Sequence, residues 1–149
     1  MFGGGPRACI SCTDGGGGKS AGIVFPDADI DLAVNGIAGG IFPAGGQSCI
    51  SGSRLLIHRS VIKEFTDKLV KIVSKACVGP PNDPNTQIGP MANEPHYQRV
   101  LKLITEAVNA GHNIVLDGRS ECRDEGYYIG PTVFSNVPNN SKLAQTEIF

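Results

Sequence analysis

The chain has 149 residues, a net charge of −1 at pH 7 and 40% hydrophobic residues, which is typical of one soluble domain with its own core. The near-zero charge gives no electrostatic basis for binding nucleic acid or an anionic membrane surface, and no apolar run approaches the roughly 20 residues that cross a bilayer. The N-terminus lacks a secretory signal pattern. Five cysteines, an odd number at irregular spacing, argue against a disulfide framework and favour a reducing, cytoplasmic location.

The N-terminal segment 1–18 is dominated by glycine and small polar residues, so it has little apolar surface with which to offset its ordering entropy. We interpret it as a poorly ordered leader to a domain that spans 19–149. Residues 21–25 form an apolar run that ends at a proline, which predicts a short buried strand. Asp29 can then cap a helix that reaches about Phe42.

A second strand is predicted at 54–58, and Ser60 is positioned to cap a longer helix that reaches Cys77. The apolar residues of this helix recur at helical spacing, which predicts that one face is buried. Proline, glycine and asparagine are frequent at 79–85, and they predict a turn-rich connection across the surface.

A third helix is predicted from Glu94 to Gly111, because glycine suits the left-handed position that ends a helix. Residues 113–116 predict the next strand, and residues 127–134 predict a strand that a Gly-Pro pair interrupts. Ser141 can cap a short final helix. Alternating strands and helices with short turns predict the α/β class, with a mostly parallel twisted sheet flanked by helices. In such sheets ligands collect beyond the carboxyl ends of the strands.

Two motifs lack the spacing that their usual chemistry requires. Residues 15–20 (GGGGKS) resemble the end of a phosphate-binding loop, but Thr13 stands where that loop needs a glycine. Cys9 and Cys12 have the spacing of half a zinc site or of a redox pair, but there is no second pair, and the three histidines fall on different predicted elements. We therefore predict no metal site.

The segment 45–54 (GGQSCISGSR) places one thiol among small residues, between a predicted helix and a predicted strand. Small neighbours leave room for a substrate carbonyl, and backbone N–H groups in such a turn can bind the oxyanion that forms when a thiolate attacks. Cys49 is therefore the candidate nucleophile. Cys77, in a predicted helix, and Cys122, in a polar loop, lack this setting and are expected to be inert.

Other short motifs accompany this cysteine along the chain. They are GGKS at 17–20 with FPDAD at 25–29, GQSC at 46–49 with GSR at 52–54, IGPM at 88–91, GYY at 126–128 with GPTV at 130–133, and EIF at 147–149. Together and in this order, they resemble the aldehyde dehydrogenase superfamily from about Gly17 to Phe149.

The resemblance implies oxidation of a small-molecule aldehyde to a carboxylic acid with NAD or NADP, through a thiohemiacetal and a thioester on Cys49. The backbone N–H of Cys49 would be one oxyanion donor, and Gln47 and Arg54 would support the loop. Glu147 would hold the nicotinamide ribose, and Phe149 would pack near the nicotinamide ring.

The chain also departs from the family pattern. Gly15 stands where the family has the glutamate that activates water for thioester hydrolysis, and loss of a general base typically costs roughly 10²–10⁴ in rate. The nucleotide-binding half, the asparagine that completes the oxyanion hole and the oligomerisation strands are also absent. We therefore expect a partial catalytic domain with little turnover of its own and with exposed edges that favour self-association. Two alternatives stay open, namely a non-catalytic truncated fragment or subunit-pairing module, and a residual cysteine esterase or acyltransferase.

Overall fold

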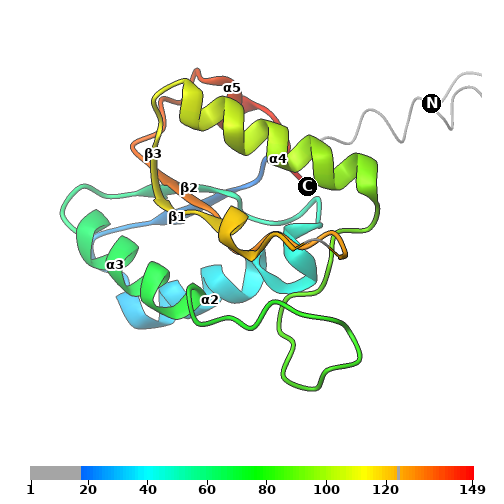
Figure 1. Ribbon diagram of the computed structural model, residues 1–149. Coiled ribbons are helices and arrows are strands. Elements are labelled where there is room, and N and C mark those ends of the chain that lie inside the picture. Colours follow the sequence, from blue (N-terminus) through cyan, green and yellow to red (C-terminus); the bar gives the residue numbers. More distant parts are fainter. Residues whose placement is uncertain (1–17, 124) are drawn as a thin grey trace, which may run out of the picture.

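The structure is a computed structural model that describes residues 18–123 and 125–149, so the predicted leader lies almost entirely outside the described residues. The strands and helices follow one another along the chain in the predicted order (Figure 1). The elements are β1 (Ala21–Val24), α2 (Ile30–Ile41), β2 (Arg54–Ile57), α3 (Ile62–Val73), α4 (Glu94–Asn109), β3 (Asn113–Leu116), β4 (Val133–Ser135) and α5 (Lys142–Gln145).

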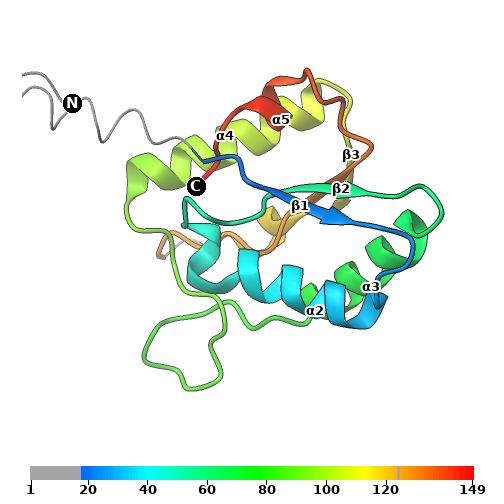
Figure 2. The same ribbon diagram turned by 180° about the vertical axis from the view of Figure 1, so that it is seen from behind.

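The first two strand–helix units form a parallel strand pair with a helical layer on one face. Strands β1 and β2 are parallel, and helices α2 and α3 pack against each other on the same side of the pair in both views (Figures 1 and 2). Val34 and Phe65 are fully buried where the helices meet the sheet. This arrangement confirms the predicted α/β class.

The strand at β1 is less buried than its apolar sequence predicts. Val24 is 5% exposed, but Ile23 is 62% exposed and Phe25 is 65% exposed. Ile23 lies opposite Leu56 across the parallel pair, so the two side chains share one face. Helices α2 and α3 pack directly on the other face, whereas α4 and α5 lie on the opposite side of the pair in both views, across a cavity that Leu56 lines (Figures 1 and 2). We call Ile23 and Leu56 the uncovered sheet face.

The start and end of α3 differ from the prediction. The helix begins at Ile62 without a side-chain cap, because the Ser60 hydroxyl is hydrogen-bonded to the His58 ring at 2.8 Å instead. It ends at Val73 rather than near Cys77. The Lys75 and Ala76 N–H groups donate to carbonyls three residues back, which tightens the last turn and stops the helix.

The other predicted caps agree with the structure. Asp29 accepts a hydrogen bond from the Leu32 N–H at 3.0 Å at the start of α2. Ser141 accepts one from the Ala144 N–H at 3.2 Å at the start of α5. Gly111 has φ of 80°, the left-handed conformation expected after α4.

The second pair of strands runs antiparallel, which the sequence did not predict. Strands β3 and β4 form their own sheet, with Ile114 opposite Phe134, so only the β1–β2 pair fits the expected parallel arrangement. The predicted strand at 127–134 is reduced to β4. Its first part packs on the turn after β3, where a Cβ on Gly118 would lie only 1.9 Å from the Gly130 carbonyl oxygen. This close contact replaces strand pairing.

The second sheet packs on α4 in a separate apolar cluster. The buried side chains of this cluster come from α4, from the segment before it and from the segment before β4, and they are Met91, Val100, Ile104 and Ile129. Among the residues that the structure describes, no helix is long and apolar enough to cross a membrane.

Candidate active site

The segment that precedes Cys49 has an unusual backbone. After α2, the segment Pro43–Gly46 is an irregular turn with three successive residues of positive φ, namely Ala44 (56°), Gly45 (63°) and Gly46 (74°). Glycine takes this left-handed conformation readily, whereas alanine is strained in it. The sequence therefore turns sharply here and directs the chain from α2 toward the cysteine.

Cys49 occupies a tight turn. The Ser51 N–H donates to the Ser48 carbonyl at 3.2 Å, so Cys49 and Ile50 are the two central residues of a β-turn. The thiol is exposed. No backbone carbonyl in the described ranges accepts a hydrogen bond from the Cys49 or Ile50 N–H. The turn therefore presents two backbone donors next to an accessible sulfur.

The segment that leads into β1 supports this turn from behind. A Cβ on Gly18 would lie 2.1 Å from the Cys49 carbonyl oxygen, so the two backbones are in direct contact. The Ser20 hydroxyl donates to the same oxygen at 3.4 Å. Arg54 Nε donates to the Lys19 carbonyl at 2.9 Å, which ties the far end of the turn to this segment.

Gln47 connects the turn to the segment before α4. Its side-chain nitrogen donates to the Ala44 carbonyl at 3.0 Å, and its side-chain oxygen accepts from the Ala92 N–H at 2.9 Å. Both groups of the amide are therefore used within the protein. This geometry suits the supporting role that the resemblance implies for Gln47.

Helix α4 holds the C-terminal stretch of the chain. Arg99 donates to the carbonyls of Glu147 and Ile148 at 2.6 and 2.5 Å, and the His96 ring is hydrogen-bonded to the Phe149 carbonyl at 2.9 Å. The rings of His96 and Phe149 also meet edge to face, with centroids 6.1 Å apart. His96 and Arg99 are three residues apart and so lie on one face of the helix.

One cleft brings the two regions together. It has a volume of about 360 Å³, within the range of small-molecule sites, and Cys49, Arg54, Glu147 and Phe149 all line it. Gln47 does not line it. The cleft therefore joins four of the five residues that the sequence singles out, from segments that lie almost 100 residues apart.

The sequence profile of the aldehyde dehydrogenase family matches residues 7–149. The chain belongs to the aldehyde dehydrogenase family. It is 41% identical over 133 residues to retinal dehydrogenase 2 of Taeniopygia guttata, which covers 89% of this chain and 26% of that relative. The chain thus spans about a quarter of the length of the curated relatives that it matches.

Solved aldehyde dehydrogenases have the same fold over the shared part. An NAD-dependent aldehyde dehydrogenase from Sinorhizobium meliloti superposes with a TM-score of 0.84 at 39% identity, covering 89% of this chain and 26% of that chain. A mutant of aldehyde dehydrogenase C from Pseudomonas syringae, in complex with NAD⁺ and octanal, gives a TM-score of 0.83 at 33% identity over 89% of this chain and 28% of that chain.

Three features of this family member were not predicted from its sequence. His96 and Arg99 fall within the helix predicted from Glu94, and their spacing of three residues is the sequence signal for a shared face. Lys19 also lines the cleft. Burial lowers the pKa of Lys19, the nearby Arg54 cation lowers it further, and the Glu147 carboxylate opposes both effects. The cleft thus holds two cations and one carboxylate near the exposed thiol.

Some predicted features fall on residues outside the described ranges. Cys9, Cys12 and the Gly15 position of the missing general base all lie there. Within residues 18–123 and 125–149, no group of three or more histidine, cysteine or acidic residues is arranged to hold a metal ion.

Proposed function

We propose that Cys49 is the nucleophile of an aldehyde-oxidising site, and that residues 19–149 are part of a catalytic domain preceded by a leader at 1–18. The thiolate adds to an aldehyde carbonyl, and the resulting oxyanion accepts hydrogen bonds from the backbone N–H groups of Cys49 and Ile50. The observation that carries this proposal is the position of an exposed thiol in the cleft that Glu147 and Phe149 also line.

The residues present fit the nicotinamide end of NAD or NADP. The Glu147 carboxylate can accept hydrogen bonds from ribose hydroxyls, and Phe149 offers an aromatic surface in the same cleft. Gly18 leaves space beside the Glu147 carboxylate, because a Cβ there would lie 2.9 Å from Glu147 Oε1. When bound, the dinucleotide supplies a hydride acceptor. The chain's own residues supply the nucleophile, the oxyanion donors and the orientation of the bound aldehyde.

The second half of the reaction lacks its general base in this chain. Because Gly15 replaces the family's glutamate, water attacks a thioester on Cys49 without assistance. We therefore propose that a small-molecule aldehyde is oxidised once per thiol, and that the acyl group then leaves slowly.

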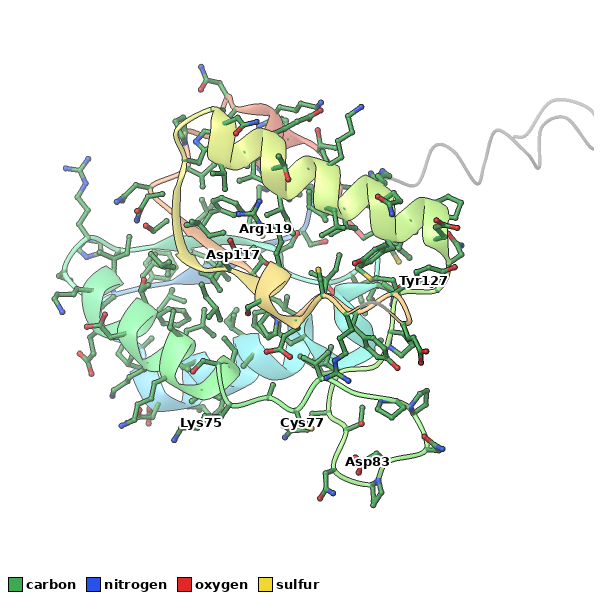
Figure 3. The ribbon with its side chains drawn as sticks, in the orientation of Figure 1. Lys75, Cys77, Asp83, Asp117, Arg119 and Tyr127 are labelled. Carbon is green, nitrogen blue, oxygen red and sulfur yellow. The ribbon has the colours of Figure 1, made fainter. Side chains whose placement is uncertain are left out.

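A burst experiment tests this proposal. The purified chain is mixed with NAD⁺ and an aldehyde such as octanal, and the absorbance of the reduced cofactor is followed. We expect a burst of at most one equivalent per chain, with slow turnover after it, and Cys49→Ser should remove it. The matched control is Cys77→Ser, because Cys77 is also exposed but lies on the connection after α3 (Figure 3) and does not line the cleft. A burst that survives Cys49→Ser would contradict the proposal.

One observation favours a second candidate function, a non-catalytic module that pairs with another polypeptide or with itself. The uncovered sheet face exposes two neighbouring apolar side chains, with Ile23 62% and Leu56 49% exposed. Such surfaces mark association sites in soluble proteins.

A cysteine esterase or acyltransferase is a third candidate, since attack by Cys49 on an ester requires no nicotinamide. We also propose a cytoplasmic location, on the basis of the odd number of cysteines.

A further inference from the structure

Ser51 is the one buried polar side chain in the described part of the chain. It is 6% exposed, and its Oγ is the only buried side-chain nitrogen or oxygen within residues 18–123 and 125–149 that has no hydrogen-bond partner. A buried hydroxyl without a partner has given up its hydrogen bonds to water and gained none in return, so the free protein is destabilised at this position.

The turn itself does not need this hydroxyl. The Ser51 N–H donates to the Ser48 carbonyl at 3.2 Å, and the Ser51 carbonyl accepts from the Ser53 N–H at 2.7 Å. Both are backbone hydrogen bonds, which alanine would make equally well. The structure therefore shows no hydrogen bond from the Ser51 side chain that stabilises the turn.

The position of Ser51 suggests where a partner comes from. Ser51 follows Cys49 by two residues in the same turn, and both residues line the same cleft. A small molecule that reaches the Cys49 sulfur therefore comes close to a hydroxyl that no other group of the described residues engages. Since the hydroxyl is shielded from solvent, water does not compete strongly for it.

We propose that the Ser51 hydroxyl is a further hydrogen-bond donor to the carbonyl oxygen of a substrate that Cys49 attacks. This inference rests on the proposed function of Cys49. In the attack, the sulfur forms a bond to the carbonyl carbon and the π electron pair moves to the oxygen. Ser51 would stabilise that negative charge together with the backbone donors of the turn.

Two reagents separate this role from a general effect on the thiol. With p-nitrophenyl acetate, the thiolate attacks the carbonyl, the oxyanion collapses, the carbon–oxygen bond breaks, and p-nitrophenolate leaves an acetyl thioester on Cys49. The thiol proton passes to the buffer. With iodoacetamide, the thiolate displaces iodide and no oxyanion forms. We expect Ser51→Ala to slow acetylation of Cys49 by roughly 10²-fold, while alkylation keeps the wild-type rate.

Ser74→Ala is the matched control. Ser74 is exposed to solvent after α3 and does not line the cleft, so its removal should leave both rates unchanged. Thermal melting adds a further test. Ser51→Ala should melt at the wild-type temperature or above it, because the variant removes an unpaired buried hydroxyl.

The possible outcomes are distinct. Unchanged acetylation in Ser51→Ala would overturn this inference alone. Equal slowing with both reagents, or a lower melting temperature, would assign Ser51 a structural role and also overturn it. If mass spectrometry finds no acetyl group on Cys49 of the wild-type chain, both this inference and the proposed function fail.

Discussion

At the residue scale, the Cys49 turn depends on the lack of a side chain at Gly18. Gly18 lies directly against the Cys49 carbonyl, and the atom that a Cβ would meet at 2.1 Å belongs to the backbone. A flexible side chain could move away, but this carbonyl is fixed by the turn itself and by the Ser20 hydroxyl. The glycine at position 18 therefore sets how closely the segment before β1 approaches the Cys49 backbone.

We predict that Gly18→Ala displaces the Cys49 turn. Overpacking of this kind typically costs about 1–3 kcal/mol of stability, and the altered turn should change the alkylation rate of Cys49. Calorimetry and timed iodoacetamide labelling would measure the two effects. The control is Gly36→Ala in α2, where no atom lies within 4 Å of the added Cβ, and there we expect a gain of roughly 0.5–1 kcal/mol. A Gly18→Ala variant with wild-type melting and labelling would contradict the prediction.

At the element scale, a charged turn holds the connection from β3 to β4. The Asp117 and Arg119 side chains form an ion pair of 2.6 Å (Figure 3), and Asp117 also accepts the Arg119 N–H at 3.0 Å. The side-chain hydrogen bond from Arg119 lowers the pKa of Asp117 below its ordinary value of 3.8. Both groups are about one-third exposed, so solvent screens the pair.

We predict a pH dependence that originates at this turn. A carboxyl group whose pKa is lowered by folding adds stability above its unfolded-state pKa, and this stability is lost as the pH falls through the folded-state pKa. Asp117→Asn should therefore melt below wild type at neutral pH, and the difference should shrink below about pH 3.8. Melting curves across the acidic range would test this. Asp27→Asn, which removes an exposed carboxylate, is the control and should show no such convergence.

At the scale of the whole molecule, the parallel pair packs directly on helices at one face only, because a cavity separates its other face from α4. Ile23 and Leu56 lie side by side on the other face, and no further strand among the described residues pairs with β1 or β2. Both free edges also expose backbone hydrogen-bonding groups, which favours association between chains.

We predict concentration-dependent self-association through this uncovered sheet face. Ile23→Lys should shift sedimentation toward the monomer, because a charge on the apolar face opposes its burial. Leu32→Lys is the matched control, since Leu32 is also highly exposed but lies on α2. A wild-type chain that remains monomeric at all concentrations, or equal effects of the two lysines, would refute this mode of association.

Short-range signals in the sequence determined much of this protein. The strand–helix units, the caps at Asp29 and Ser141, and the left-handed Gly111 depend on neighbours within a few residues, so local rules suffice to predict them. The small residues around Cys49 predicted a turn at this cysteine for the same reason. The resemblance to the family also followed from short contiguous sequence motifs.

Only the tertiary structure decided the features that depend on distant partners. The antiparallel pairing of β3 with β4 and the exposure of Ile23 depend on which surfaces meet after folding. The hydrogen bonds from Arg99 to the C-terminal stretch join residues almost 50 positions apart. The sequence likewise does not predict the unpaired hydroxyl of Ser51, because the burial and hydrogen-bond partners of a serine depend on the residues packed around it. Packing between segments far apart in the chain decides burial and hydrogen-bond partners, and local sequence does not encode it.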